Sequence, residues 1–355
     1  MKRSRATIGI AAVTTTLASV AAFTVAPAAN AATASEPIAT GLAGPLQMDV
    51  EGDRVVVAQN FIGVLSEVNA DGTPEELFKQ TKGEVAGVAI EGEDVAFLTT
   101  QFSHKNPASF LKLLHGDGSV DKIANLYEYE ADANPDGTTR YGFRDLSKKC
   151  KAKVPKYYSY KGIVESHPYG LADAPGGGWY VADAAANAIL YVAPDGTVDL
   201  LSVMPTQPHV VTAKQAEAEE LPKCVAGHAY HFEAVPTDVE VDEGGELVVS
   251  LLPGGPEGDA LGARGSVVRI NPDTGVTTVL AGELAGATNV AVDGTDVYVS
   301  QLFGGQISKI ASDGTVSSFF EAKQPAALEW ADGKLYAAIK VFNQKQGGSI
   351  VAITP

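Results

Sequence analysis

A unit of four short apolar segments recurs along this chain, and the repetition limits the fold more than any other feature. A second and a third segment in each unit are rich in the β-branched and aromatic residues that favour strands. Six units of about 40 residues, each with four strands, predict a six-bladed β-propeller. The segments that open the units are Pro45-Leu-Gln-Met-Asp-Val, Val85-Ala-Gly-Val-Ala-Ile, Pro168-Tyr-Gly-Leu-Ala, Pro236-Thr-Asp-Val-Glu-Val, Ala287-Thr-Asn-Val-Ala-Val and Pro325-Ala-Ala-Leu-Glu-Trp.

The third segment of most units runs into a turn built on aspartate and glycine. Asp-Gly between apolar runs is a strong hairpin signal because its backbone tolerates positive φ, so we expect a fourth strand after each turn. The sixth unit stops after its third segment, at Pro355. We expect segment 37–42 to supply the missing strand and close the ring, which removes an open sheet edge. The turns are Asp71-Gly72, Asp117-Gly118, Asp195-Gly196, Asp273-Thr-Gly275 and Asp313-Gly314.

The fold class that follows is all-β, a six-bladed propeller of four-stranded antiparallel blades closed by the mature N-terminal strand. Two turn-to-turn intervals, 117–195 and 195–273, each span 78 residues, so an eight-bladed ring is the alternative. We interpret the excess length as two insertions, at about 125–165 and 205–234, because neither interval carries another full set of strands. Long excursions from a compact scaffold often form lids or binding loops.

Each insertion carries one cysteine, Cys150 in the first and Cys224 in the second. An even count in an exported chain predicts a disulfide, and closing a loop of this length stabilises by roughly 4 kcal/mol in the chain-entropy model. Two free thiols are one alternative, and a zinc site of Cys224 with His228 and His231 is another. The first insertion is rich in tyrosine and lysine, and we predict that it forms a recognition surface.

The first 31 residues have the features of a cleavable signal peptide. Lys2, Arg3 and Arg5 precede an apolar stretch, and Ala29-Asn30-Ala31 is a small-x-small cleavage site. A membrane anchor is the alternative, but the stretch carries several hydroxyl residues and is weak for a span. We therefore expect domains 1–31 (signal peptide) and 32–355 (propeller), with the mature protein secreted, extracellular, monomeric and not inserted in a membrane.

The charge of the chain argues against nucleic acid as its partner. The formal net charge is −17, and removing the signal peptide makes it more negative still. A chain this acidic repels nucleic acid and anionic lipid. The partners that we expect are a small molecule, a glycan or an extracellular protein.

Four motifs carry a resemblance to known propellers that extends over the whole mature chain. The chain resembles the six-bladed propellers grouped as NHL, SMP-30/gluconolactonase and streptogramin-lyase-like proteins, and within them the ScyD/ScyE family of exported bacterial proteins. These motifs specify fold far better than activity, and the family name implies no established reaction. They are Thr40-Gly-Leu-Ala-Gly-Pro45, Glu165-Ser-His-Pro-Tyr-Gly-Leu171, Asp195-Gly-Thr-Val and Asn289-Val-Ala-Val.

The resemblance implies a set of channel residues. SMP-30-like lactonases hold a divalent ion with a Glu, an Asn and an Asp, which here implies Asp238 and Asn289 as metal ligands for one calcium or magnesium ion. Gln47 stands at the glutamate position, and the loss of that carboxylate counts against a lactonase. Ordering channel water is the structural alternative for these polar groups.

Histidines provide the other candidate chemistry. Streptogramin-lyase-like propellers use a histidine as general acid or base, so the resemblance implies a catalytic role for His167. We predict Gln47, His167, His209 and Gln301 as ligand-binding residues. Two functions follow: an extracellular binding module of unknown ligand, which we favour, and a divalent-metal-assisted hydrolase or lyase. No nucleophile-elbow, P-loop or dinucleotide motif is present.

Overall fold

The computed structural model describes residues 34–103, 105–255 and 261–355, so the predicted signal peptide lies outside the described residues. The described chain is all-β, with seven four-stranded antiparallel sheets. Five of these sheets are built from consecutive strands, as the repeat predicts. In the sixth, β1 pairs antiparallel with β28, next to β27 and β26.

The strands of the first three consecutive sheets follow the predicted segments closely. The first sheet holds β2 (Pro45–Glu51), β3 (Arg54–Gln59), β4 (Val64–Val68) and β5 (Pro74–Lys79). The second holds β6 (Glu84–Glu91), β7 (Asp94–Gln101), β8 (Ala108–Leu114) and β9 (Val120–Asn125). The third holds β12 (Pro168–Asp173), β13 (Trp179–Asp183), β14 (Ala188–Val192) and β15 (Val198–Val203).

The remaining sheets of the repeat have the same order. One holds β18 (Pro236–Val241), β19 (Leu247–Leu251), β20 (Gly265–Ile270) and β21 (Thr277–Leu284). The next holds β22 (Ala287–Asp293), β23 (Asp296–Gln301), β24 (Gln306–Ile310) and β25 (Val316–Glu321). The last holds β26 (Leu328–Ala331), β27 (Lys334–Ile339), β28 (Gly348–Thr354) and β1 (Ala34–Leu42).

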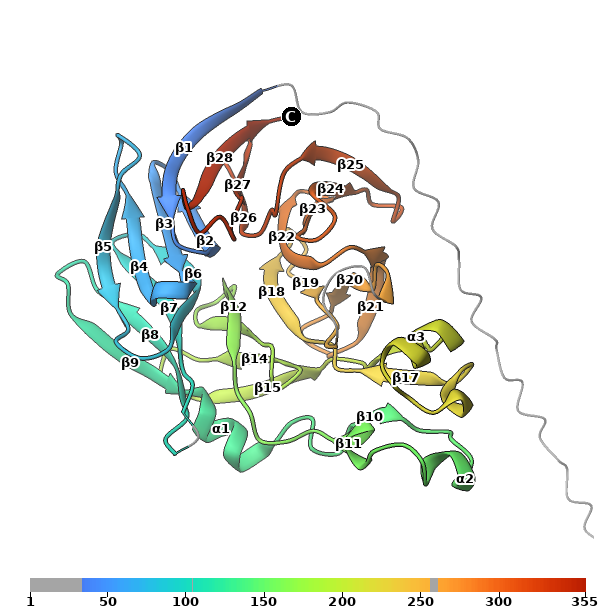
Figure 1. Cartoon of the computed structure of the whole chain (residues 1–355). Helices are drawn as coiled ribbons and strands as arrows, with labels where there is room; N and C mark the ends of the chain where they lie inside the picture. The colour runs from blue at the N-terminus through green and yellow to red at the C-terminus, as the bar shows by residue number, and fades with distance from the viewer. Residues whose placement is uncertain (1–33, 104, 256–260) are drawn as a thin grey trace, which may run out of the picture.

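The first strands of these six sheets surround a common centre. Figure 1 shows β2, β6, β12, β18, β22 and β26 innermost, with the other strands of each sheet fanning outward. Each inner strand contacts the next, and β26 contacts β2, so the contacts form a closed ring. Apolar side chains fill the spaces between neighbouring sheets; Leu65 and Phe97, for example, are fully buried between the first and second sheets.

The predicted aspartate–glycine turns have one geometry wherever Gly directly follows Asp. In each, the glycine has a φ between 81° and 86°, a backbone conformation that glycine adopts without steric cost. The aspartate carboxylate accepts a hydrogen bond from the backbone N–H two residues later, at 2.9–3.0 Å. These carboxylates close turns, which accounts for the four aspartates without any binding role.

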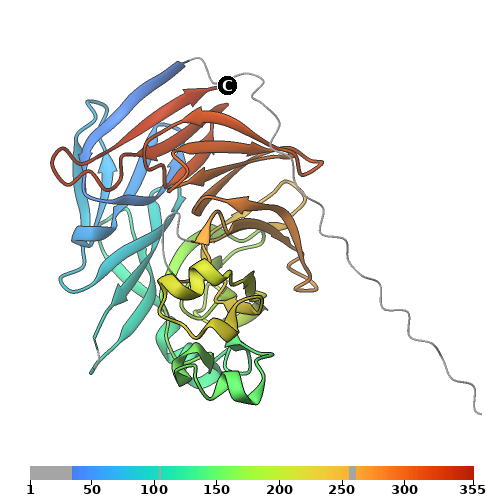
Figure 2. The same cartoon turned by 45° about the vertical axis from the view of Figure 1, so that its right-hand side comes forward.

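The two predicted insertions combine into one seventh sheet. It contains β11 (Ser159–Lys161), β10 (Arg140–Phe143), β17 (Ala229–Phe232) and β16 (Gln207–Val210), two strands from each insertion. Figures 1 and 2 show this sheet at the periphery of the ring. Its helical segments are α1 (Leu126–Ala133), α2 (Lys148–Lys151), α3 (Ala213–Ala218), η2 (Lys156–Tyr158) and η3 (Lys223–Val225), while η1 (Asn60–Ile62) lies in the first sheet of the ring.

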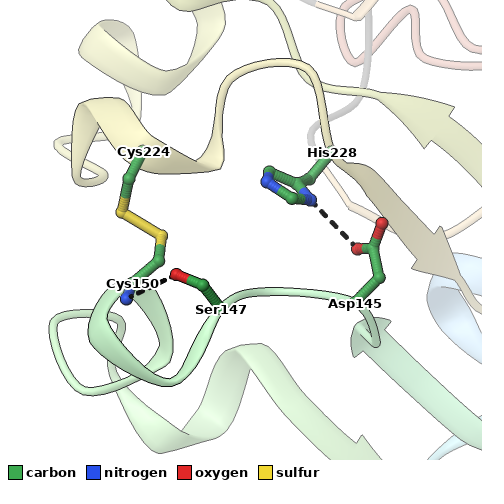
Figure 3. Close-up of a disulfide and its surroundings, with 5 residues drawn as sticks. All are labelled: Asp145, Ser147, Cys150, Cys224 and His228. Atoms are coloured by element: carbon green, nitrogen blue, oxygen red, sulfur yellow. Dashed lines mark hydrogen bonds and ion pairs between the residues drawn. A yellow bond between two sulfur atoms is a disulfide. The ribbon is translucent and has the colours of Figure 1, made fainter.

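The predicted disulfide between Cys150 and Cys224 is present. It joins α2 of the first insertion to η3 of the second (Figure 3). Cys150 is part of a small separate core with Phe143, Val211 and Val225. The zinc alternative is therefore wrong, because Cys224 is bonded to sulfur. No helix among the described residues is long and apolar enough to cross a membrane.

A glycine at the centre of the ring lets two inner strands approach closely. A Cβ atom added to Gly170 on β12 would lie 2.6 Å from the Cα of Asp238 on β18. That contact is with backbone, so it cannot be relieved by a side-chain rotation. Gly170 therefore fixes the spacing of β12 and β18 next to a predicted site residue.

We expect Gly170→Ala to lower the free energy of unfolding by about 1–3 kcal/mol, as overpacking of a tight core does. Chemical denaturation followed by tryptophan fluorescence measures the change. Gly282→Ala is the matched control, because a Cβ there meets nothing within 4 Å. Equal stability of the two variants would contradict the close approach of these strands.

Candidate functional site

Three of the predicted ring residues meet at one end of the central channel. Gln47, Asp238 and Asn289 each occupy the third position of an inner strand, and each is at most 4% exposed. The Asn289 amide donates to Gln47 Oε1 at 3.1 Å, and the Gln47 amide donates to the Thr237 carbonyl at 2.9 Å. The repeat thus brings together side chains that are far apart in the sequence.

Asp238 is the only carboxyl group of this trio, and its surroundings disfavour ionisation. Burial raises the pKa of Asp238 to about 7, although hydrogen bonds from the backbone N–H groups of Val290 and Val239 and from the amides of Asn289 and Gln47 act against the shift. The N–H of Val290, on the next inner strand, donates to Asp238 Oδ2 at 2.9 Å. Asp238 therefore joins two neighbouring sheets.

The trio is a poor match for the divalent cation that the resemblance implies. Calcium and magnesium need several oxygen ligands and gain most from carboxylates. Here one carboxylate is present, the Gln47 oxygen is occupied by Asn289, and the Asn289 amide also donates to the Leu46 carbonyl at 3.3 Å. No group of three or more His, Cys, Asp or Glu side chains within the described ranges has metal-binding geometry. These residues as arranged do not fit the ion.

His167 lies at the same end of the ring, immediately before β12, and forms an ion pair with Glu84. Glu84 is the first residue of β6, the neighbouring inner strand. The backbone N–H of His167 donates to Asp183 Oδ1 at 2.7 Å, which fixes the histidine backbone. The His167 side chain is 29% exposed, so the imidazole is held firmly yet reaches solvent.

The imidazole of His167 lines a pocket of 540 Å³ with largely apolar walls. Phe102 lies edge-on to the His167 ring at 5.1 Å between ring centroids. Tyr127, on α1, brings the first insertion to the rim of the pocket. A cavity of this size, largely apolar with a few polar side chains such as His167 and Glu165 on its wall, is typical of a small-molecule site. The other apolar lining residues include Pro107, Ile163 and Val164.

The electrostatic surroundings of His167 favour the protonated imidazole. Burial by itself acts to lower the pKa of His167, but the hydrogen bond and charge of Glu84, with the charges of Asp183 and Glu165, outweigh it and raise the pKa. Tyr169 lies against His167, with 5.4 Å between ring centroids, and its own pKa is raised by burial and by the charges of Glu84 and Asp238. Tyr169 therefore links the histidine pair to the amide–carboxyl trio.

Sequence reasoning missed Glu84 and Tyr169, although the repeat contained the signal for Glu84. Glu84 directly precedes Val85 as His167 directly precedes Pro168, so the two hold equivalent positions in adjacent units. The repeat therefore places Glu84 and His167 side by side at the mouth of the ring. No local pattern marks Tyr169. It becomes a candidate because its strand, β12, lies between β6, which carries Glu84, and β18, which carries Asp238.

The other two predicted ligand-binding residues lie elsewhere. The Gln301 amide oxygen accepts from Ala285 N at 2.7 Å and its nitrogen donates to Ser308 Oγ at 2.7 Å, so both ends are occupied within one sheet. Gln59 makes the equivalent pair of hydrogen bonds in the first sheet, which indicates a structural role for both. His209 lies on β16 in the insertion sheet and faces Gln215 at 3.2 Å.

Further along the channel, a second layer consists of acids. Asp49 and Glu240 occupy the fifth position of their inner strands, Glu329 is the second residue of β26, and Asp173 ends β12. Burial raises the pKa of Glu240 well above its usual range, and the charges of Glu329, Asp238, Asp49 and Asp173 raise it further. Burial also raises the pKa of Glu329, as do the charges of Asp49 and Asp238. The channel therefore favours protonated carboxyl groups.

Known structures share this fold at low sequence identity. No family model and no curated protein matches the sequence. Streptogramin B lyase is similar with a TM-score of 0.52 and 15% identity, over 90% of this chain and 97% of that one. A catalytically inactive histidine-to-alanine variant of virginiamycin B lyase from Staphylococcus aureus, with quinupristin, has a TM-score of 0.50 and 13% identity, over 91% and 98% of the two chains. A putative gluconolactonase has a TM-score of 0.53 and 13% identity, over 90% and 91%. At these identities the likeness establishes the β-propeller fold alone.

We expect the Glu84→Gln substitution to lower the pKa of His167, because burial then acts against a weaker counter-charge. Titration of the imidazole by NMR measures the change, with the wild-type value expected above 6.5. His115 serves as the internal control, since its pKa is raised by Asp94 and Asp121 instead. An unchanged His167 pKa in the variant would rule out the pair as the cause.

We expect Glu240→Gln to stabilise the protein at pH 8 by about 1 kcal/mol or more, since it removes a buried, unpaired charge. The pKa of such a carboxyl group is higher in the folded protein than in the unfolded chain. Its stabilising contribution is complete below the pKa of the unfolded chain and is lost as the pH rises through the pKa of the folded protein. Near pH 4 Glu240 is neutral in both states, so the gain should vanish. Thermal denaturation at both pH values tests this, with exposed Glu243→Gln as control. A gain of equal size at pH 4 would contradict it.

Proposed function

We propose that this chain is an acid–base enzyme of the lyase or hydrolase class, with His167 as the general base. The observation that carries the proposal is that His167, paired with Glu84, lines the largely apolar pocket. Glu84 orients the imidazole and stabilises the imidazolium that forms when a proton is taken, which is the usual role of a carboxylate behind a catalytic histidine. The pocket wall supplies binding area for an organic substrate.

In the lyase form of the reaction, neutral His167 takes a proton from a carbon of the substrate. The electron pair of the broken C–H bond forms a C=C double bond, and the neighbouring C–O bond breaks. The leaving oxygen then receives the proton from the His167 imidazolium, so atoms and charges balance without water. In the hydrolase form, His167 takes the proton from a water molecule, whose oxygen attacks an ester or lactone carbonyl, and returns it to the leaving oxygen.

The pH dependence follows from the raised pKa of His167. A base must be unprotonated, so activity should rise with pH as His167 loses its proton, at a value above 6.5. The structural neighbours support the choice of a histidine, because one of them is a lyase variant inactivated by a histidine-to-alanine change. The resemblance implies one bound divalent cation, which remains a proposal. The acid–base steps do not depend on it.

The number of blades, the closure of the ring and the cellular location belong to the same proposal. We infer that the six sheets around the common centre are blades, that β1 closes the last blade, and that the seventh sheet is an insertion. Export by the predicted signal peptide, and an extracellular location, are supported by the Cys150–Cys224 disulfide, because such bonds persist in oxidising compartments. Membership of the ScyD/ScyE family rests on the sequence motifs alone.

An extracellular binding module is the second candidate function. The peripheral insertion sheet favours it, since this sheet adds a surface that the ring itself does not need. The two functions are compatible, because the insertion reaches the pocket through Tyr127 on α1 and through segment 163–165, whereas the strands of the insertion sheet do not line it. The ligand would be a small molecule, a glycan or another protein.

We expect purified mature protein to convert a member of a panel of lactones, esters and cyclic depsipeptides that includes quinupristin. Mass spectrometry separates the two reactions, since ring opening by a lyase leaves the mass unchanged and hydrolysis adds one water. His167→Ala should reduce the rate by about 10²–10⁴-fold, the usual contribution of a general base. An unchanged rate in His167→Ala would overturn the assignment of His167 as general base. The assignment would also fall if no member of the panel is converted and none perturbs the NMR signal of His167.

A further inference from the structure

One stretch of the first insertion is strongly basic in an otherwise acidic protein. Residues 140–161 contain eight basic residues and one acid, Asp145, for a formal charge of +7. The whole chain carries −17, so all other residues together carry −24. The eight are Arg140, Arg144, Lys148, Lys149, Lys151, Lys153, Lys156 and Lys161.

Ion pairs within the protein do not neutralise these cations. None of the eight forms an ion pair with any residue that the structure describes, whereas Arg54, Arg269 and Lys309 on the ring each pair with a carboxylate. The one acid of the stretch, Asp145, faces His228 at 3.2 Å (Figure 3). A cluster of unpaired cations on a protein rich in acids leaves a local positive potential that is free to act on an external anion.

Four of the cations surround a cavity. Its volume is 350 Å³, and Arg140, Arg144, Lys151 and Lys156 line it together with the rings of Phe143 and Tyr158. Arg144 is held in place, because its Nε donates to the Arg140 carbonyl at 2.9 Å and its Nη2 donates to Thr206 Oγ1 at 3.0 Å. We call these six lining residues the basic pocket.

We propose that the basic pocket binds an acidic polysaccharide, a polymer whose sugar units carry carboxylate or phosphate groups. Cationic side chains supply the attraction to the anionic groups, and aromatic rings give the apolar faces of sugar rings a surface to pack on. Tyr157 extends that surface, since it is 70% exposed and lies 4.7 Å from the Tyr158 ring. The inference rests on the binding role proposed for the insertion and not on the chemistry at His167.

Charge density favours a polysaccharide over nucleic acid. Double-stranded DNA carries a charge about every 1.7 Å of its axis, so a bound duplex would also meet the negative field of the ring. A polymer with at most one charge per sugar is repelled less, and at physiological salt the field of the ring is screened over about 8 Å. The insertion sheet lies at the periphery of the molecule, where a chain can touch the basic pocket without crossing the ring (Figure 2).

The test compares two double variants of the mature protein that lose the same charge. Lys151→Gln/Lys156→Gln removes two cations of the basic pocket, and Lys82→Gln/Lys345→Gln removes two exposed cations from the ring. Binding to polygalacturonate and to phosphomannan is measured by affinity electrophoresis and calorimetry over a range of salt concentrations. Neutral mannan and duplex DNA are the comparison polymers.

We expect wild-type protein to bind polygalacturonate, phosphomannan or both, to ignore neutral mannan, and to lose affinity as salt rises. The pocket variant should bind about tenfold more weakly and lower the slope of log affinity against log salt by about 1–2, while the ring variant stays close to wild type. The two acidic polymers separate carboxylate from phosphate recognition.

Three results would overturn the inference: equal loss in both variants, tighter binding to DNA than to either acidic polysaccharide, or self-association of the protein that the pocket variant abolishes. If no polymer binds, the binding role of the insertion fails as well. His167→Ala should retain polymer binding. Failure of the polysaccharide inference therefore leaves the acid–base proposal standing, and failure of the acid–base proposal leaves the polysaccharide inference standing.

Discussion

The crowding of six inner strands around one axis is the constraint on which the rest of the structure depends. Each inner strand contacts two others, so the residues nearest the axis must be very small or must hydrogen-bond across the gap. Gly87, the fourth residue of β6, and Gly170, the third of β12, leave room, while Gln47, Asp238 and Asn289 at the third position of their strands fill it and hydrogen-bond across it. Further along the channel the same crowding brings carboxyl groups together and raises the pKa of Glu240 and Glu329.

The candidate active site follows from the same arrangement. His167 and Glu84 come from equivalent positions before or at the start of two neighbouring inner strands, so the spacing of β6 and β12 sets their contact. A rigid ring holds such a pair in one geometry without a mobile loop. The pocket beside it gains its wall from irregular segments, including the chain around Phe102 and the end of the first insertion.

Charge is divided between two parts of the molecule. The ring concentrates acids, and burial raises the pKa of several of them in the channel, whereas the insertion sheet has its own small core, its own disulfide and a surplus of cations without ion pairs. The two proposed roles, acid–base chemistry on a small substrate and binding of an anionic polymer, therefore fall on separate parts of the molecule. Neither role requires the other, because the two sites share no lining residue.

The sequence by itself determined the repeat, the strand positions, the turns and the disulfide, because these depend on local patterns: apolar segments, Asp-Gly pairs and one cysteine in each insertion. Channel residues Gln47, Asp238 and Asn289 were also predictable, since equivalent repeat positions meet at the axis. Only the tertiary structure decided that two insertions pair into one sheet and that four cations surround one cavity. Those features depend on which distant strands become neighbours, and no local pattern records that choice.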